Sequence, residues 1–173
     1  MINTLKKIFC ALLFGLFFCF YSAPAQAQSF YFEDSLIGEQ SPDFTLKTLK
    51  QEALSLKDFR QGKPVIVFFW ATWCPHCREQ LKLLSEHAKA IEEKGIKVAL
   101  VDLEEPAETV EAYMQKYSVP FDVFFDEEGQ VAELYSIIGV PTFFFIDQAG
   151  IIQGMEHVFP EDYEEIIAGQ AKS

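Results

Sequence analysis

Residues 65–77 read Val-Ile-Val-Phe-Phe-Trp-Ala-Thr-Trp-Cys-Pro-His-Cys. The run from Val65 to Trp70 is apolar without alternation, which predicts a central strand covered on both faces. A helical pattern follows the cysteines and reaches Lys94. Two cysteines separated by two residues at a helix start lie about one turn apart on one face, so they can close a disulfide ring. This stretch therefore predicts a dithiol redox site between a buried strand and a helix.

The order of residues within the pair predicts how it would react. Cys74 would face the unpaired backbone amides of the helix N-terminus, whose partial positive charge favours the thiolate. His76 is a second candidate for stabilising that thiolate, and Pro75 precedes it. Cys74 would attack a partner disulfide and Cys77 would resolve the mixed disulfide. A stabilised thiolate makes the disulfide form the stronger oxidant.

Metal binding is the alternative for a cysteine pair, and the surrounding sequence disfavours it. A closed zinc site needs four ligands, but no second Cys-x-x-Cys is present and His87 and His157 stand at unhelpful spacings. Covalent haem attachment needs histidine directly after the second cysteine, where this chain has Arg78. The prediction is disulfide exchange that requires no metal and no organic cofactor.

The first 27 residues have the features of a secretory signal. Two lysines precede an apolar stretch over 8–21, which is too short for a confident membrane span, and a small-x-small pattern ends at Ala27. We expect cleavage after Ala27, with cleavage after Ala25 or an uncleaved anchor as alternatives. The prediction is export by the Sec route, and the periplasm is the expected location.

Removal of this signal changes the composition in an informative way. Two lysines leave, so the formal net charge moves from -12 to -14, and Cys74 and Cys77 remain of the four cysteines. A single close pair in an exported chain serves exchange and not the stapling of a small scaffold. Strong acidity argues against nucleic acid or anionic lipid as a partner. Residues 28–37 read as a polar lead and 38–173 as one domain, which we expect to be monomeric.

Hydrophobic periodicity predicts an α/β fold. Strands are expected at 44–46, 53–56, 65–70, 98–101, 121–125, 142–146 and 151–153, and helices from the dithiol to 94, over 106–117, over 131–137 and from Pro160. Strands that alternate with helices imply parallel neighbours with crossover helices on the sheet faces. The first two strands and the last two read as hairpins, which makes the predicted central sheet mixed.

Several motifs occur together in a specific order and spacing between Gly38 and about Gly154. They are Ser-Pro-Asp-Phe-Thr-Leu at 41–46, Phe-Trp-Ala-Thr-Trp-Cys at 69–74, the dithiol, Gly-Val-Pro-Thr at 139–142 and Ile-Asp at 146–147. With them the chain resembles the thioredoxin-fold thiol-disulfide oxidoreductases of exported TlpA/ResA type. The resemblance implies a thioredoxin-like sheet with helices on both faces and an N-terminal hairpin extension.

The resemblance also implies how the site is assembled. It implies an exposed Cys74, a more buried Cys77, and a cis-proline loop opposite the disulfide. An extended substrate segment would pair with this loop as an added strand. The residues expected to bind substrate are Trp73, Val140, Pro141 and Thr142, whereas Trp70 is expected in the core.

Three departures from the family pattern concern proton transfer. Phe68 stands where thioredoxin has a buried acid, and Gln80 stands where ResA-like members commonly have Glu. Lys82 replaces a helix proline, so we expect a weaker kink there. The sequence alone therefore names no proton acceptor for Cys77.

The direction of exchange is left open by two opposing features. The Pro75-His76 pair resembles strongly oxidising DsbA-type sites, whereas the scaffold resembles reductants of cytochrome maturation. We expect a reductase or general oxidoreductase that acts on protein thiols or disulfides, with apocytochromes among the candidate substrates and a membrane redox partner for recycling. A DsbA-like dithiol oxidase is the alternative.

Two other functional classes are weaker. Thr72-x-Cys74 is one residue short of the peroxiredoxin Thr-x-x-Cys motif, which disfavours a peroxidase. A binding module that merely inherited the dithiol is the non-enzymatic alternative, and a Cys74 variant would distinguish it from an enzyme.

Overall fold

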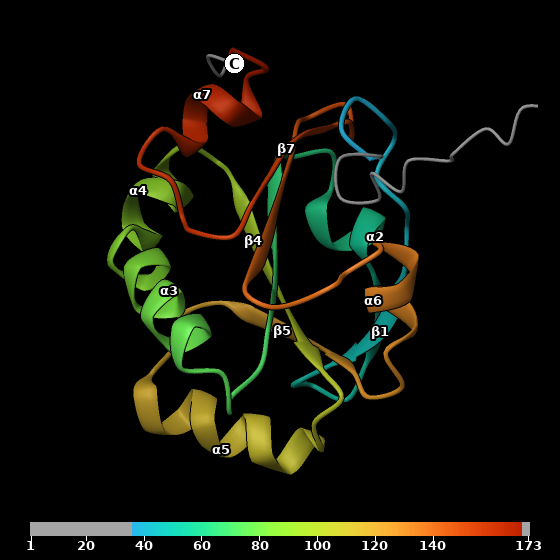
Figure 1. Ribbon diagram of the computed structural model, residues 1–173, viewed down its shortest axis with the longest axis vertical. Helices are drawn as coiled ribbons and strands as arrows, with labels where there is room; N and C mark the ends of the chain where they lie inside the picture. The colour runs from blue at the N-terminus through green and yellow to red at the C-terminus, as the bar shows by residue number, and fades with distance from the viewer. Residues whose placement is uncertain (1–35, 171–173) are drawn as a thin grey trace, which may run out of the picture. The chain divides into compact units, whose positions relative to one another are not determined.

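The computed structural model of this chain describes residues 36–170 (Figure 1). The predicted signal over 1–27 and nearly all of the predicted lead over 28–37 lie outside the described residues. Within them, seven strands form one sheet with the order β2-β1-β5-β4-β3-β6-β7. The strands are β1 Thr45–Thr48, β2 Ala53–Ser55, β3 Val65–Trp70, β4 Lys97–Leu103, β5 Asp122–Asp126, β6 Thr142–Ile146 and β7 Ile152–Glu156. The helices are α2 Leu56–Arg60, α3 Pro75–Glu86, α4 Ala88–Glu93, α5 Ala107–Tyr117, α6 Gln130–Leu134 and α7 Tyr163–Ile167.

Strand β3 lies near the middle of the sheet, as the apolar run predicts. All six of its residues are buried. It pairs in parallel with β4 and antiparallel with β6, and β4 pairs in parallel with β5. The mixed sheet is confirmed, and it brings the carboxyl ends of β3 and β4 to one edge.

Helices cover both faces of the sheet. Figure 1 shows α3, α4, α5 and α7 on one side and α2 and α6 on the other. Ile66, Phe68 and Trp70 of β3 belong to the core on the α3 side, together with both cysteines. Val65, Val67 and Phe69 belong to the core on the other side. The alternation of a strand thus divides one apolar run between two cores.

Both predicted hairpins form. β1 and β2 pair antiparallel, with Leu46 opposite Leu54, and β6 and β7 pair antiparallel across the turn at Gly150. The first hairpin also joins the main sheet, because β1 pairs antiparallel with β5. The N-terminal extension is therefore part of the central sheet.

The helix predicted to run to Lys94 is two helices, and that expectation was wrong in this detail. α3 ends at Glu86 and α4 begins at Ala88, with His87 between them. The His87 ring packs against Phe159 and Tyr163, with centroids 5.4 and 6.3 Å away, and His87 is half-buried. The predicted cap is confirmed, because Gly95 has a φ of 71° and donates its N–H to Glu92.

Two further differences concern short helices. α2 was not predicted, although Ser55 at its N-cap accepts a hydrogen bond from the Asp58 N–H, 2.9 Å away. α7 begins at Tyr163, three residues after the predicted start at Pro160. Among residues 36–170, no helix has the length and apolar character needed to cross a bilayer.

Candidate functional site

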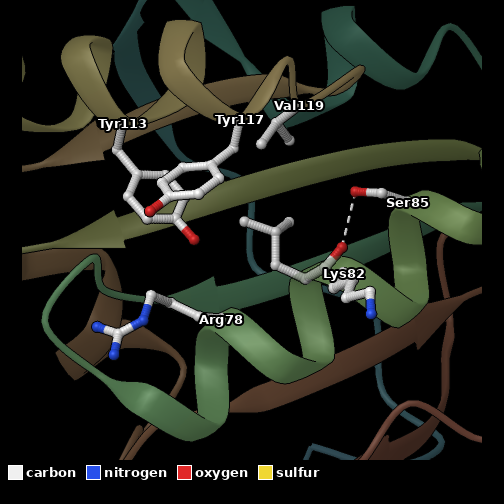
Figure 2. Close-up of a pocket in the computed structure, with 7 residues that line it drawn as sticks. Arg78, Lys82, Ser85, Tyr113, Tyr117 and Val119 are labelled. Carbon is white, nitrogen blue, oxygen red and sulfur yellow. Dashed lines mark hydrogen bonds between the residues drawn. The ribbon is translucent and has the colours of Figure 1, made fainter.

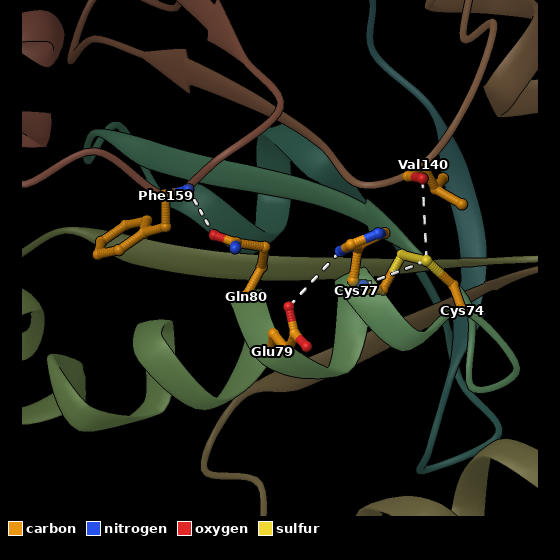
Figure 3. A network of polar contacts seen from close by, with 7 residues as sticks. Cys74, Cys77, Glu79, Gln80, Val140 and Phe159 are labelled. Carbon is orange, nitrogen blue, oxygen red and sulfur yellow. Dashed lines mark hydrogen bonds and ion pairs between the residues drawn. A yellow bond between two sulfur atoms is a disulfide. The ribbon is translucent and has the colours of Figure 1, made fainter.

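The two cysteines form a disulfide at the N-terminus of α3. Their Cα atoms are 5.2 Å apart. Cys74 is the N-cap residue, and its Sγ accepts a hydrogen bond from the Cys77 N–H, 3.1 Å away. Pro75 occupies the first turn, where its missing N–H costs nothing. Figure 3 shows the disulfide at the start of the helix, beside the loop that carries Val140.

The electrostatic setting of Cys74 favours a negative charge on sulfur. Helix α3 has 12 residues, and its first turn contains no acidic side chain. A negative charge at such a helix terminus gains about 0.3–1 kcal/mol, and up to about 2 kcal/mol where it is partly buried. The thiolate of Cys74 is the group placed to use this stabilisation.

Burial of the pair follows the expected order, but Cys74 is less exposed than expected. Cys74 is 5% exposed and Cys77 is 0% exposed. Trp73 is 65% exposed directly before Cys74, whereas Trp70 is fully buried, as predicted for both tryptophans. Trp73 therefore presents an exposed aromatic ring directly before the nearly buried Cys74.

His76 points away from the protein body. Its side chain is 81% exposed, and its Nδ1 lies 3.5 Å from Oε2 of Glu79, whose side chain is 70% exposed. This ion pair, drawn in Figure 3, is available only when His76 is protonated. Glu79 therefore offsets part of any positive charge that His76 brings to the dithiol.

The loop opposite the disulfide contains a cis peptide bond between Val140 and Pro141, as the resemblance implies. The carbonyl oxygen of Val140 lies 3.8 Å from Cys74 Sγ. Thr142 is 3% exposed, and its hydroxyl donates to the Gly139 carbonyl, 2.8 Å away. The Thr142 side chain thus supports the loop from inside, and Val140 is the residue that meets the sulfur.

His157 also lies at this loop, although the sequence analysis did not place it among the site residues. Its Nδ1 is 2.9 Å from the Pro141 carbonyl oxygen and 3.2 Å from Thr142 Oγ1. Both neighbours can accept from an Nδ1–H, which favours the tautomer protonated there. The end of β7 therefore holds the cis-proline loop through an imidazole ring. Its long separation in sequence from Pro141 left no local signal of this contact.

The three positions that depart from the family pattern have other roles here. Phe68 is fully buried and stacks on Phe143, with ring centroids 4.0 Å apart. Gln80 accepts a hydrogen bond from the Phe159 N–H, 2.8 Å away, as Figure 3 shows. Lys82 is exposed and pairs with Glu86. No proton acceptor stands at these three positions.

Two acids that the sequence reasoning missed lie beside the site. Glu105 accepts hydrogen bonds from the Thr72 N–H and hydroxyl at 2.5 and 2.6 Å. Asp102, at the end of β4, is 1% exposed, and burial and the charge of Glu105 raise its pKa to about 9. The sequence does contain a signal for them, because both acids lie at or just beyond the carboxyl end of a buried strand that runs parallel to β3.

A groove of about 310 Å³ lies between α3 and α5. Figure 2 shows Arg78 and Lys82 on one wall and the paired rings of Tyr113 and Tyr117 on the other. The two tyrosine ring centroids are 4.5 Å apart. Arg78 also donates to the Thr72 carbonyl, 2.9 Å away, so the groove wall and the loop before Cys74 are connected.

Side chains of the types that bind metal ions are dispersed over the part of the chain that the structure describes. Over residues 36–170, no three or more side chains of His, Cys, Asp or Glu gather as metal ligands would. The two cysteines are bonded to each other. The chemistry that this arrangement can perform is thiol-disulfide exchange.

Comparisons with known proteins agree with the geometry. Residues 37–155 match the AhpC/TSA family. "Thioredoxin-like protein YneN" of Bacillus subtilis is 36% identical over 118 residues, which cover 67% of this chain and 68% of that protein. "Thiol-disulfide oxidoreductase ResA" of Bacillus thuringiensis subsp. konkukian is 33% identical over 114 residues, and the match covers 66% of this chain and 65% of the relative's length.

A solved structure supports the same fold. A putative thiol:disulfide interchange protein DsbE from Chlorobium tepidum aligns with a TM-score of 0.68 and 30% identity, over 78% of this chain and 98% of that one. The thioredoxin-like fold is thereby confirmed. The chain belongs to the AhpC/TSA family, and within it to the thioredoxin-fold proteins that resemble ResA.

Proposed function

We propose that this chain is an exported thiol-disulfide oxidoreductase that exchanges disulfides with protein substrates through Cys74 and Cys77. The observation that carries the proposal is the disulfide at the N-terminus of α3, opposite the cis-proline loop. The names of the ResA and DsbE relatives support the same reaction class.

In the reducing direction, the Cys74 thiolate attacks one sulfur of a substrate disulfide. A bond forms between Cys74 and the substrate, and the substrate's own S–S bond breaks. Its second sulfur leaves as a thiolate and takes up a proton. Cys77 then gives up its proton and attacks Cys74 Sγ, which releases the first substrate sulfur. Two electrons have passed to the substrate, and the Cys74–Cys77 disulfide has formed.

An extended substrate segment would bind along the cis-proline loop. Val140 faces Cys74, and its backbone offers groups to an added strand. Pro141 and Thr142 hold that backbone in place, and exposed Trp73 supplies an apolar contact beside the thiol. These four residues are the proposed substrate-binding set, and Pro75 and His76 are the proposed tuning pair.

A dithiol oxidase is the second candidate, and the Pro75-His76 pair favours it. Direction is set by reduction potential, which is about -270 mV for thioredoxin and about -120 mV for DsbA. The resemblance to ResA favours the reducing direction, and His76 is expected to raise the potential. A glutathione redox titration of the purified protein decides between them.

The proposed setting is the periplasm, reached by the Sec route. The substrates would be cysteine pairs in other exported proteins, with apocytochromes as one class. A membrane redox partner would return electrons to the Cys74–Cys77 disulfide. The proposed working form is a monomer with no bound cofactor.

A trapping experiment tests the exchange reaction. The Cys77→Ser variant retains the nucleophile and should accumulate a mixed disulfide with a disulfide-bonded peptide, whereas Cys74→Ser should not. The matched pair separates the two roles by mass spectrometry of alkylated protein. A wild-type protein that forms no mixed species and exchanges no disulfide with glutathione would refute the proposal.

Two further measurements distinguish an exchange enzyme from a binding module and from a peroxidase. A binding module would keep its partners in the Cys74→Ser variant. A peroxidase would consume peroxide with a thiol reductant at a rate that exceeds its exchange with protein disulfides.

A further inference from the structure

The groove between α3 and α5 carries a charge opposite to that of the whole protein (Figure 2). The chain has a formal net charge of -12. The charged side chains that line the groove, Arg78 and Lys82, are nevertheless both cations, and none of its lining residues is acidic. A second hollow, of about 400 Å³ beside α4, is lined by three lysines together with Glu92 and Asp122. The groove between α3 and α5 is therefore locally positive, with no acid of its own.

The wall that faces these cations is a pair of aromatic rings on α5. Tyr113 packs on the buried Trp70, with ring centroids 5.4 Å apart, and on Tyr117, 4.5 Å away. Tyr117 is 54% exposed, and Nζ of Lys116 lies 5.1 Å from the centroid of its ring. The core thus anchors this wall on one side while solvent reaches it on the other. A ligand would meet a preformed aromatic surface, which lowers the entropy lost on binding.

Two apolar side chains complete the lining of the groove. Leu81 of α3 is 2% exposed, and the half-buried Val119 packs against the same core. Protein interfaces are enriched in tyrosine and arginine, and their strongest contacts are apolar or aromatic anchors seated in pockets. This combination of walls suits an aromatic or leucine side chain that is flanked by carboxylates.

The groove runs beside the helix that carries the dithiol. Arg78 directly follows Cys77, and Leu81 lies four residues after Cys77, about 6 Å further along the helix axis. The cis-proline loop leads into β6, whereas α5 connects β4 with β5. In the sheet, β3 lies between β4 and β6. A substrate that contacts both the loop and the groove would therefore extend to both sides of Cys74.

We propose that this groove binds an acidic segment of the protein substrate, with an aromatic or leucine side chain between the two walls and its flanking carboxylates beside Arg78 and Lys82. The inference rests on the proposed function, because it adds a second contact for the substrate of Cys74. It also gives the substrate a distinguishing chemistry, since an extended backbone alone is common to all unfolded segments.

Both cations are able to take a new partner. Arg78 donates one nitrogen to the Thr72 carbonyl, and the other N–H groups of its guanidinium remain for a carboxylate. Lys82 is 79% exposed, and its Nζ lies 3.8 Å from Oε1 of Glu86, whose side chain is 55% exposed. Such exposed pairs contribute little stability, so Lys82 can turn toward a bound carboxylate at small cost.

The negative charge of the rest of the chain does not prevent this contact. Charges that are more than about 8 Å apart are largely screened at physiological ionic strength. The cations that line the groove therefore dominate the potential that a bound segment meets. High salt should weaken the binding, because it screens these exposed cations as well.

The test uses two fluorescein-labelled peptides, each with one intramolecular disulfide. One carries Asp-Glu-Phe-Glu on both sides of its disulfide loop, and the other carries Asn-Gln-Phe-Gln there. Fluorescence anisotropy measures their binding to a protein with both Cys74→Ser and Cys77→Ser, which cannot exchange disulfides. We expect the acidic peptide to bind about tenfold more tightly at low salt, since several exposed charge pairs each contribute a few-fold.

Substitutions in the same double-serine protein locate the contact. Lys82→Glu should weaken binding of the acidic peptide about tenfold. Lys89→Glu is the matched control, because Lys89 of α4 forms the same i,i+4 pair, with Glu93 at 3.8 Å, and does not line the groove. Tyr117→Ala should weaken both peptides about fivefold, as for loss of an aromatic contact, whereas Tyr117→Phe should retain most of the binding.

Three results would overturn the inference: no binding of the acidic peptide, equal binding of the two peptides, or equal effects of Lys82→Glu and Lys89→Glu. Each of them would leave disulfide exchange between the wild-type protein and glutathione intact. Failure of the proposed function would look different, because the wild-type protein would then exchange no disulfide with glutathione, whatever the peptides do in the double-serine protein.

Discussion

The side chain of Gln80 in α3 accepts a hydrogen bond from the backbone N–H of Phe159, 2.8 Å away, and so ties the dithiol helix to the segment before α7. Phe159 is 7% exposed and packs on Phe143 and Tyr163. A position where ResA-like proteins commonly carry Glu is used here as a neutral acceptor.

Gln80→Leu should lower the free energy of unfolding by about 1–3 kcal/mol, because the Phe159 N–H loses its partner in a largely buried place. Gln80→Glu keeps an acceptor and should stay closer to the wild type. Urea unfolding of the three proteins measures the difference. If Gln80→Leu is as stable as the wild type, the hydrogen bond contributes nothing.

The same Gln80→Glu variant should make the protein more reducing. A carboxylate one turn after Cys77 disfavours the Cys74 thiolate, so the reduced form loses stability relative to the disulfide. The midpoint potential should therefore fall in a glutathione titration at neutral pH. A rise in the potential would contradict this account of the charge at position 80.

His76 and Glu79 should shift the midpoint potential in opposite directions. His76→Pro removes a positive charge near Cys74 and should lower the potential, since proline is tolerated in a first helical turn. Glu79→Gln removes the offsetting carboxylate, 3.5 Å from His76, and should raise it. Because both side chains are exposed, we expect shifts of about 20 mV or less, equivalent to about 1 kcal/mol. An unchanged potential in His76→Pro would remove His76 from the tuning pair.

The stability of the protein should depend on pH through Asp102. Its pKa is about 9 in the folded protein, against about 3.9 for an unfolded carboxyl. The folded chain therefore binds more protons between these values, and stability falls as pH rises from about 4 to about 9. Asp102→Asn removes this loss, so its advantage over the wild type should grow with pH, by at most about 1.4 kcal/mol per unit. Urea unfolding at pH 5, 7 and 9 measures it, and an advantage independent of pH would contradict the assignment.

Gly154 in β7 has no room for a side chain. A Cβ at this position would lie 2.6 Å from Cγ2 of Ile166, a buried residue of α7. Gly154→Ala should therefore cost about 1–3 kcal/mol as α7 is pushed outward. Gly139→Ala is the matched control, because a Cβ there meets nothing within 4 Å. Equal thermal unfolding midpoints for the two variants would show that α7 moves freely.

The elements predicted correctly from the sequence are those that a continuous local pattern of side chains determines. The β3 run from Val65 to Trp70 and the β6 run from Thr142 to Ile146 have the predicted bounds. The predicted strand at 98–101 was too short, because β4 runs from Lys97 to Leu103. Asp102 stays in the strand because the parallel ladder with β3 extends to Trp70.

What the sequence did not reveal depends on contacts between distant segments. The break at His87 coincides with its packing on Phe159 and Tyr163, which lie more than 70 residues away. The role of His157 likewise depends on a contact between segments distant in sequence, because its Nδ1 meets the Pro141 carbonyl from the end of β7. Helix α2 is a different case, because its N-cap contact between Ser55 and Asp58 is local in the sequence.

The sulfur of Cys74 has two roles. It is the atom proposed to carry electrons, and it also caps the N-terminus of α3 by accepting a hydrogen bond from the Cys77 N–H. Serine at this position can still serve as a helix cap, whereas alanine cannot. A comparison of the two replacements would therefore separate loss of electron transfer from fraying of the helix that presents it, a distinction that a single knockout conceals.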